Sequence, residues 1–264
     1  MKTLKRGSKG EAVKLWQARI RVEVDGDFGP RTEIATKTWQ KTNSLKPDGI
    51  VGPDTQQKAG FVKTKHSNLY VIRIPFNAIL DADVLLGKRQ RVEDFDFSYD
   101  MILNAGLFCM QSGKNTTDLV IDGKLDNGGN YTDKGLAFDG NKIYPARTSE
   151  IVGKSNVDFL GGGPTLIWDF VKHLDLKGIV SSLLSSITQR MAFGVDNEAF
   201  YIITTGRENK CSLYTILAEG LYQKLKTLIG GDGGGSVALD WLGIIFTGNR
   251  PIPTVIALKL ARWW

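Results

Sequence analysis

A glycine-rich stretch with one acidic side chain is the part of the sequence best suited to chemistry. It reads Leu228-Ile-Gly-Gly-Asp-Gly-Gly-Gly-Ser-Val-Ala-Leu239, so Asp232 lies among five glycines between two apolar edges. Positions without a Cβ let main-chain N–H groups approach a ligand closely, and those of Gly233, Gly234 and Gly235 could form an anion nest. The stretch predicts a ligand-binding loop in which Asp232 is base, nucleophile or metal ligand. A bulged tight turn is the structural alternative.

Four other stretches combine small residues with polar ones and could contribute to the same site. They are Asn104-Ala-Gly-Leu-Phe108, Gly161-Gly-Gly-Pro-Thr-Leu166, Arg190-Met-Ala-Phe-Gly-Val-Asp196 and Thr205-Gly-Arg207. Arginine suits bidentate contacts, so Arg190 and Arg207 are candidate phosphate ligands, and Asn104 could orient a sugar hydroxyl or amide. Each stretch is also typical of a turn at a strand end, and each arginine could equally form a structural ion pair.

The elements that would position these residues are mostly short strands. Runs rich in β-forming residues predict strands over 69–74, 101–108, 118–122, 135–144, 165–168, 191–195, 199–204, 243–246 and 255–260. Helical periodicity is clear over 212–224, directly before the glycine-rich loop. This pattern predicts an α+β class, with a larger mixed, mainly β part that contains few helices.

The first sixty residues contain an internal repeat. Asp25-Gly-Asp-Phe-Gly-Pro-Arg-Thr32 recurs twenty-three residues later as Asp48-Gly-Ile-Val-Gly-Pro-Asp-Thr55. Asp-Gly favours a turn, and Gly-Pro places proline at the first position of a helix, where its missing N–H costs nothing. Together with an amphipathic segment around Trp16, the repeat predicts a bundle of three short helices.

The net charge of +6 is concentrated in this first part. Residues 1–65 hold 14 Lys and Arg against 7 Asp and Glu, whereas residues 66–264 hold 20 against 21. A cationic small part beside a nearly neutral large part indicates an anionic polymer as partner, such as nucleic acid, a membrane surface or an anionic cell wall. A merely soluble surface is the simpler interpretation.

Residues 2–60 resemble the three-helix type of peptidoglycan-binding domain. The resemblance rests on the opening Leu4-Lys-Arg-Gly-Ser-Lys-Gly-Glu-Ala-Val13 and on both Asp-Gly…Gly-Pro turns. It implies anchoring to the bacterial cell wall, and it favours wall polymers over nucleic acid as the anionic partner. We therefore expect a peptidoglycan-binding domain over 1–60, a short polar linker over 61–68 and a catalytic domain over 69–264.

Residues 99–260 resemble the phosphodiester glycosidase family. The five stretches named above occur in the family's order, and Asp-Gly-Gly-Gly-Ser is the most specific of them. The resemblance implies hydrolysis of a bond between an anomeric carbon and a phosphodiester. It implies Asp232, Asn104 and Arg190 as catalytic residues, and as substrate-binding residues Gly106, Gly163, Arg207, Gly233, Gly234, Gly235 and Ser236. The chain departs from the family at Thr205, Gly230-Gly231 and Val237, where the family commonly has Asp, Asn-Leu and Ser or Thr.

Several other chemistries find little support in the sequence. Cys109 and Cys211 are 102 residues apart and form no disulfide framework, and His66 and His173 lie in no zinc or Cys/His amidase motif. No run reaches the length of a membrane span, and no signal peptide is visible at the N-terminus. No metal site is predicted. A calcium ion is conceivable as cofactor, although no loop has the spacing of a calcium motif.

The sequence therefore predicts a monomeric, endolysin-like enzyme, made in the cytoplasm and acting at the bacterial cell wall. Its substrate would be peptidoglycan or an attached wall polymer, cleaved at a glycosidic or sugar-1-phosphodiester bond. Cleavage of peptidoglycan itself would require a second carboxylate, for which Asp139, Asp196 and Glu198 are candidates. The alternative is a wall-binding protein whose glycosidase-like domain is inactive.

Overall fold

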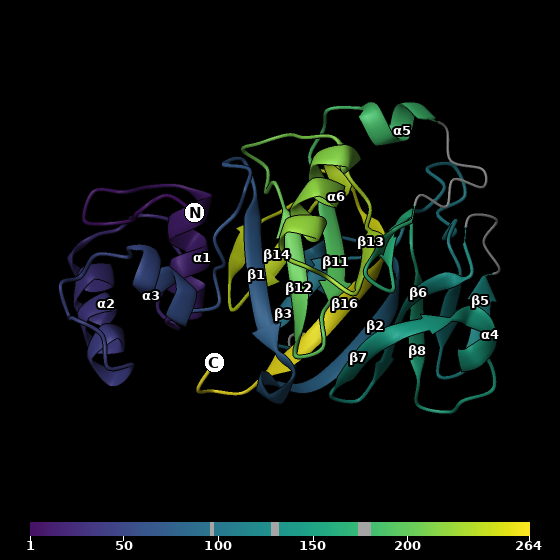
Figure 1. The fold of residues 1–264 in the computed structure, drawn as a ribbon, viewed down its shortest axis with the longest axis horizontal. Helices are drawn as coiled ribbons and strands as arrows, with labels where there is room; N and C mark the ends of the chain where they lie inside the picture. Colours follow the sequence, from purple (N-terminus) through teal and green to yellow (C-terminus); the bar gives the residue numbers. More distant parts are fainter. Residues whose placement is uncertain (96–97, 128–131, 174–180) are drawn as a thin grey trace.

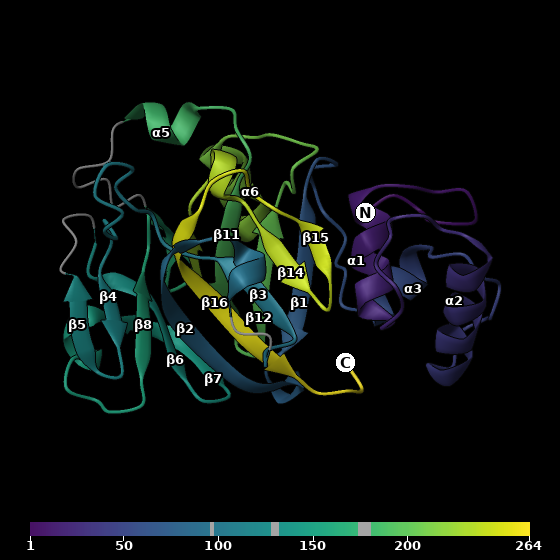
Figure 2. The ribbon, with the colours of Figure 1, turned by 180° about the vertical axis from the view of Figure 1, so that it is seen from behind.

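The computed structural model describes residues 1–95, 98–127, 132–173 and 181–264. Three helices at the N-terminus lie beside a larger, mainly β part, and the C-terminus returns to the side that faces these helices (Figures 1 and 2). The described helices are α1 (Glu11–Arg19), α2 (Pro30–Thr42), α3 (Pro53–Lys58), α4 (Thr148–Ile151), α5 (Ser181–Ser185) and α6 (Leu213–Tyr222), with 3-10 turns η1 (Phe76–Ala78), η2 (Val92–Asp94) and η3 (Gly234–Ser236). Of these, none has the length and apolar character needed to cross a bilayer.

The repeat predicted from the sequence builds two nearly identical hydrogen-bond networks. Gln17 of α1 donates to Asp25 Oδ1 and Thr32 Oγ1 at 2.6 and 3.0 Å, and its Oε1 accepts the Gly26 N–H at 2.8 Å. Gln40 of α2, twenty-three residues later, makes the same bonds in the second copy, with 3.0, 3.1 and 2.9 Å. Both glutamines are buried. In each copy the turn is therefore held by hydrogen bonds from a glutamine of the preceding helix. The turn motif alone did not predict these glutamines.

The described strands form three antiparallel sheets. The first has the order β1-β12-β11-β13-β9-β10, the second β15-β14-β3-β16-β2 and the third β5-β4-β8-β6-β7. Their bounds are β1 Tyr70–Pro75, β2 Ile79–Gln90, β3 Met101–Asn104, β4 Leu119–Ile121, β5 Lys124–Asn127, β6 Lys134–Asp139, β7 Lys142–Arg147, β8 Asp158–Gly161, β9 Thr165–Trp168, β10 Val171–Lys172, β11 Met191–Val195, β12 Ala199–Thr204, β13 Thr227–Gly230, β14 Leu239–Trp241, β15 Ile244–Phe246 and β16 Ile252–Leu260. The α+β class with few helices in the larger part is confirmed.

The longest strand, β2, was not predicted. It pairs with β16 along most of its length, with register shifts between Ile252 and Thr254 and between Lys259 and Leu260. Its polar and apolar residues alternate only over 80–84, and Leu80 and Leu86 face solvent. A strand of this kind gives little period-2 signal, since its pairing is determined by the partner strand.

The two largest of the four apolar clusters formed by the described residues hold most of the larger part together. One lies between the sheets and contains the stacked pair Phe193 and Phe200, whose ring centroids are 6.2 Å apart. The other lies under α6, which packs on β9 and β13 through Leu213, Ile216 and Leu217. The amphipathic helix predicted from the sequence thus covers one face of the first sheet (Figure 1).

The segment 61–68, expected to be a short polar linker, is fixed on both sides. Phe61 is buried and pairs with Ile72 of β1, and the Val62 N–H donates to the Val71 carbonyl at 3.1 Å. The fully buried Glu219 of α6 accepts the N–H groups of Lys65 and His66 at 3.0 and 3.3 Å. These contacts favour a set orientation of the helices relative to the sheets.

Aromatic packing adds a further contact at the C-terminus. Trp264 is buried and stacks on Trp241 of β14 at 5.5 Å, and the Arg19 guanidinium of α1 lies 4.7 Å from the Trp264 ring. Burial lowers the pKa of Arg19 to about 10. The last residue of the chain therefore packs between an N-terminal helix and the second sheet.

Candidate active site

The predicted site segments meet at one end of the strands. β11 begins directly after Arg190, whereas β12, β13 and β3 end just before Thr205, Gly231 and Ala105. Because β11 is antiparallel to β12 and β13, the start of β11 lies beside the ends of these two strands. In Figure 1 this is the upper end, next to α5. The start of β11 and the ends of β12, β13 and β3 thus bring together residues that are far apart in the sequence.

Asp232 lies at the centre of this group. Its N–H donates to the Ala105 carbonyl at 3.0 Å, and its Oδ1 accepts the Gly233 N–H at 2.7 Å. The side chain is partly exposed but densely surrounded. Burial raises the pKa of Asp232, and the Ser236 hydroxyl, the Gly233 N–H and the charges of Arg250 and Arg190 offset part of this rise. The carboxylate therefore lies in an environment in which its protonation changes at higher pH than that of an ordinary aspartate.

Arg190 is the buried cation of the site. Its Nη2 donates to the carbonyls of Leu183 and Ser186 at 2.8 and 2.9 Å, and to the Ser186 hydroxyl at 2.6 Å. Its Nη1 lies 3.4 Å from the place that a Cβ on Gly233 would occupy. Its Nε has no hydrogen-bond partner in the described structure. Nη2 of Arg190 thus binds α5 and the residue that follows it, whereas Nη1 lies close to the Asp232 loop.

Arg207 and Arg250 contact the loop from two other segments. Arg207 Nη1 donates to the Gly234 carbonyl at 2.6 Å, and Arg250 Nη1 lies 3.4 Å from Ser236 Oγ. The Arg250 N–H also donates to the Gly235 carbonyl at 3.2 Å. Arg250 was not among the predicted residues. Its signal in the sequence is the turn Thr247-Gly-Asn-Arg-Pro251 shortly before β16, which lacks the run of glycines that drew attention to the other loops.

The Asn104 side chain forms hydrogen bonds to the backbone of the glycine-rich loop. Its side chain is fully buried, its Oδ1 accepts the Ala238 N–H at 3.0 Å, and its Nδ2 lies 3.4 Å from the Asp232 carbonyl. In this arrangement both polar atoms of the Asn104 side chain face backbone groups of the loop, and its role toward a sugar hydroxyl or amide stays a prediction. The Asn104 amide, at the end of a buried strand, faces the adjacent backbone of the loop. The oxygen of the amide accepts from this backbone and its nitrogen donates to it.

Two of the three N–H groups predicted to form an anion nest have acceptors within the protein. The Gly233 N–H donates to Asp232 Oδ1, and the Gly234 N–H donates to the Gln189 carbonyl at 3.0 Å. The glycines instead allow close packing. A Cβ on Gly231 would lie 2.8 Å from the Phe193 ring and 3.1 Å from the Ala105 carbonyl, and Gly234 has a φ of +60°. The glycine-rich sequence therefore allows the loop backbone to lie close to β11 and to the end of β3.

The remaining predicted residues lie around the same loop. Gly163 exchanges backbone bonds with the end of β13, since its N–H donates to the Gly230 carbonyl at 3.0 Å. Gly106 lies against Leu160, Thr117 and Asn115. Ser236 is buried next to Arg250.

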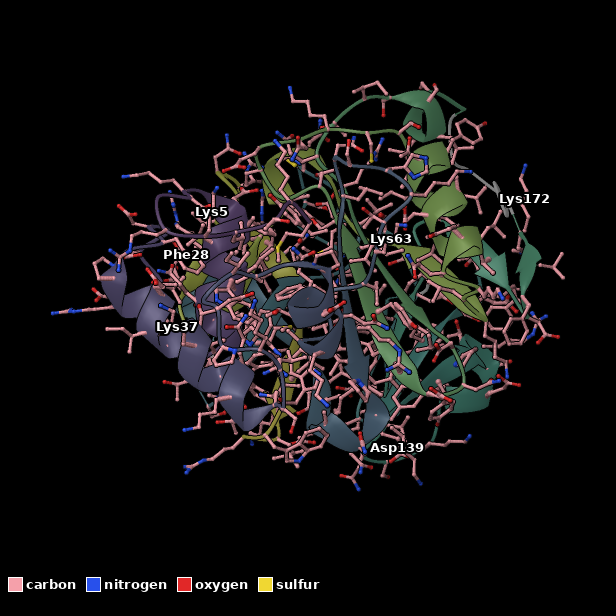
Figure 3. The ribbon with its side chains drawn as sticks, turned by 60° about the vertical axis from the view of Figure 1, so that its left-hand side comes forward. Lys5, Phe28, Lys37, Lys63, Asp139 and Lys172 are labelled. Atoms are coloured by element: carbon pink, nitrogen blue, oxygen red, sulfur yellow. The ribbon has the colours of Figure 1, made fainter. Side chains whose placement is uncertain are left out.

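The three candidates for a second carboxylate are not near Asp232. Asp196 and Glu198 form the turn between β11 and β12, at the opposite end of β11 from Arg190. A strand of five residues spans roughly 17 Å. Asp139 ends β6, and Figure 3 shows it at the end of the molecule away from α5. In the parts of the chain that the structure covers, no cluster of three or more His, Cys, Asp or Glu side chains could hold a metal ion.

Comparison with known proteins gives two findings. Residues 11–58 match the family model described as "Putative peptidoglycan binding domain". No curated protein matches the chain.

Solved structures are similar to the larger part. One is the catalytic domain of zebrafish N-acetylglucosamine-1-phosphodiester alpha-N-acetylglucosaminidase, auto-inhibited by its pro-peptide, with a TM-score of 0.60 and 15% identity over 73% of this chain and 77% of that one. Another is a hypothetical protein from Synechocystis, with a TM-score of 0.54 and 12% identity over 75% of this chain and 61% of that one. At such identities the likeness concerns the fold. The chain thus combines a peptidoglycan-binding domain with a glycosidase-like fold.

Proposed function

We propose that this protein is a cell-wall-targeted phosphodiester glycosidase. It would hydrolyse the bond between a sugar anomeric carbon and a phosphodiester in a polymer attached to peptidoglycan. The observation that carries the proposal is the pairing of one carboxylate with cations. Asp232 follows β13, Arg190 Nη1 lies 3.4 Å from the place of a Cβ on the adjacent Gly233, and Arg250 Nη1 lies 3.4 Å from Ser236 Oγ of the same loop.

This combination suits a phosphate leaving group. Departure of the phosphate leaves an oxocarbenium-like sugar, which a carboxylate stabilises or attacks. The phosphate carries negative charge away from the sugar, and guanidinium groups bind it well. A phosphate also needs less protonation than a sugar alcohol, so a single acid is sufficient.

In the proposed reaction, water adds to the anomeric carbon while the bond from that carbon to the phosphate oxygen breaks. The water oxygen remains on the sugar, and its proton is transferred to Asp232 or to solvent. The products are a sugar with a new reducing end and a phosphomonoester. Each turnover therefore forms one reducing end and one phosphate that phosphatase can remove.

Cleavage of the glycan strand of peptidoglycan is less well supported. It usually requires two carboxylates about 5–10 Å apart, and Asp196 and Glu198 lie at the far end of β11. The inactive alternative is favoured by one observation: Asn104 and two glycine N–H groups of the loop are engaged within the protein.

The test compares walls that carry anionic polymer with walls from which the polymer has been removed. Reducing ends, phosphatase-releasable phosphate and turbidity are measured for the wild type, Asp232→Asn and the control Asp240→Asn. Asp240 is a second acid whose pKa burial raises, but it accepts the Gly243 N–H instead. We expect equal amounts of reducing ends and phosphomonoester, only from polymer-bearing walls, and loss of both with Asp232→Asn.

Other outcomes would contradict the proposal. Reducing ends without phosphate, with loss of turbidity, would show cleavage of peptidoglycan. In water enriched in oxygen-18, label in the phosphomonoester would show that the phosphorus–oxygen bond is cut instead. Binding to walls without any product would favour the inactive protein.

A further inference from the structure

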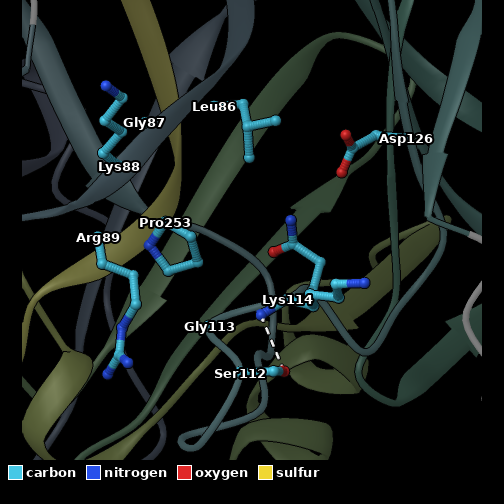
Figure 4. A pocket seen from close by; sticks show the side chains of 10 residues that line it. Leu86, Gly87, Lys88, Arg89, Ser112, Gly113, Lys114, Asp126 and Pro253 are labelled. Atoms are coloured by element: carbon cyan, nitrogen blue, oxygen red, sulfur yellow. Dashed lines mark hydrogen bonds between the residues drawn. The ribbon is translucent and has the colours of Figure 1, made fainter.

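A cavity of about 560 Å³ lies beside the candidate active site. It is formed by the end of β2, the turn at 112–115, Asp126 of β5 and Pro253 of β16 (Figure 4). Three of its ten lining residues are cations and one is an acid: Lys88, Arg89, Lys114 and Asp126. The three cations are exposed to solvent, while Asn115 and Pro253 form a buried floor.

The cationic rim is held in place by the surrounding backbone. Arg89 has a φ of +22°, its Nη1 donates to the Met110 carbonyl at 3.2 Å, and its guanidinium lies 5.5 Å from the Phe108 ring. A Cβ on Gly113 would lie 2.5 Å from Arg89 Cδ. Gly113 also has a φ of +74°. Glycine at position 113 therefore leaves room for the aliphatic part of the Arg89 side chain, which crosses the turn beside the cavity.

The turn that closes the cavity already stabilises negative charge. The Ser112 hydroxyl, the N–H groups of Ser112 and Gln111, and the charge of Arg89 lower the pKa of the Cys109 thiol. A group of donors that favours a thiolate also favours other anions placed beside it. The local field is thus positive for reasons other than the lysine side chains alone.

A short series of hydrogen bonds connects the cavity to Asp232. Asn115 Oδ1 accepts the Thr254 hydroxyl at 2.7 Å, and the Thr254 carbonyl accepts the Ala105 N–H at 3.1 Å. The Ala105 carbonyl in turn accepts the Asp232 N–H at 3.0 Å. The floor of the cavity and the candidate catalytic loop are therefore linked through the backbone at the end of β3.

We propose that this cavity is a subsite for a second phosphate of an anionic sugar-phosphate or polyol-phosphate polymer. This inference rests on the proposed function, because it places the neighbouring repeat unit of the same substrate. The positive charge that Lys88, Arg89 and Lys114 place around the cavity attracts the phosphate. Asp126, Ser112 and the Asn115 amide accept or donate hydrogen bonds to hydroxyl groups, and Leu86 and Pro253 contact the apolar face of the unit.

The composition of the cavity favours such a polymer over nucleic acid. Single-stranded nucleic acids are usually bound by aromatic side chains on which the bases stack. None of the ten lining residues is aromatic, and Phe108 lies beneath Arg89.

The experiment measures binding and turnover separately. Calorimetry measures the affinity for short poly(glycerol phosphate), which serves as the probe. It compares the Asp232→Asn protein, in which turnover is blocked, with the same protein that also carries Lys88→Ala and Lys114→Ala. The control carries Lys142→Ala and Lys154→Ala, which remove two exposed lysines elsewhere on the β part. We expect the cavity variant to bind roughly tenfold more weakly, and the control to bind as the parent does. Both pairs of lysine substitutions are also made in protein that retains Asp232. These proteins should hydrolyse a small sugar-1-phosphodiester at the same rate as the wild type, because such a substrate does not extend into the cavity.

The outcomes distinguish the two proposals. Equal affinity of the cavity variant and the control would overturn the subsite, even if Asp232-dependent hydrolysis is found. Loss of affinity in the cavity variant without any Asp232-dependent hydrolysis would keep the subsite and overturn the proposed reaction. Single-stranded DNA bound as tightly as the polymer, with the same dependence on Lys88 and Lys114, would also overturn the subsite as stated.

Discussion

The carboxylate of Glu11, the first residue of α1, accepts the N–H of Arg207 at 2.8 Å. The same carboxylate lies 3.4 Å from the Glu208 N–H, and Glu208 in turn accepts the Glu11 N–H at 3.2 Å. Because Arg207 also donates to the Gly234 carbonyl, only one residue separates the N-terminal helices from the candidate catalytic loop. The wall-binding part and the loop therefore share a physical contact.

Replacing Glu11 by Ala should loosen the turn at 206–208. Glu11 is buried, and the two N–H groups that it accepts would be left without their acceptor. We expect faster hydrogen exchange at 206–208 and at 233–236, measured by mass spectrometry on the intact protein. Unchanged exchange at 233–236 would show that the contact is not transmitted to the loop.

Glu11→Gln should flatten the pH dependence of stability. Burial raises the pKa of Glu11 in the folded protein, so the folded state holds a proton that the unfolded chain releases. The free energy of unfolding then falls as pH rises from the ordinary glutamate pKa through the raised one. We expect the wild type to lose stability across this window and the Gln variant to lose less, in urea unfolding series between pH 4 and 7. Parallel curves would contradict the assignment.

Asp232→Asn should lower turnover by orders of magnitude and slightly stabilise the fold. Burial raises the pKa of Asp232, so keeping the carboxylate ionised at neutral pH costs folding free energy that a neutral amide does not require. An amide oxygen also retains an acceptor for the Gly233 N–H. Thermal unfolding at pH 7 should give a higher Tm for Asp232→Asn than for the wild type. A lower Tm would show that the carboxylate is needed mainly for folding.

Asn104→Ala should lower activity through the position of Asp232. The substitution leaves the buried Ala238 N–H without its acceptor, which costs about 1–3 kcal/mol. Because Asn104 does not face solvent, we expect kcat to fall while KM changes little. A rise in KM alone would instead identify Asn104 as a residue that contacts substrate.

Gln40→Ala should destabilise the N-terminal helices and weaken binding to walls. Gln40 makes four hydrogen bonds to the second turn, and its loss should cost about 2 kcal/mol. Gln57→Ala, on the exposed side of α3, is the matched control. Cosedimentation with purified peptidoglycan and thermal unfolding should both separate the two variants. Equal behaviour would show that the network contributes little.

Trp264→Ala should loosen the contact between α1 and the second sheet. Trp264 is buried between Arg19 and Trp241, and truncation of a buried aromatic side chain costs about 3 kcal/mol. Its neighbour Trp263 is 61% exposed, so Trp263→Ala should have little effect on urea unfolding. If both variants unfold alike, the C-terminal contact does not stabilise the protein.

The sequence by itself determined the local features of this protein. The Asp-Gly…Gly-Pro repeat, the helix ahead of the glycine-rich loop and most strands depend on turn chemistry and on periodicity within a few residues. Asp232, Arg190 and Arg207 could be selected from the same short segments, because reactive residues beside glycines stand out without any knowledge of the fold.

Only the tertiary structure decided how these residues are used. The hydrogen bonds of Asn104 and Gly234 are directed inward because the end of β3 and the residues before β11 pack against the loop, and no local pattern indicates which backbone will lie opposite. Arg250 and β2 were missed for the same reason, since each is placed by a partner distant in sequence. Likewise, the contact of Glu11 with Arg207 joins residues that are 196 positions apart, and only packing of the helices against the sheets could create it.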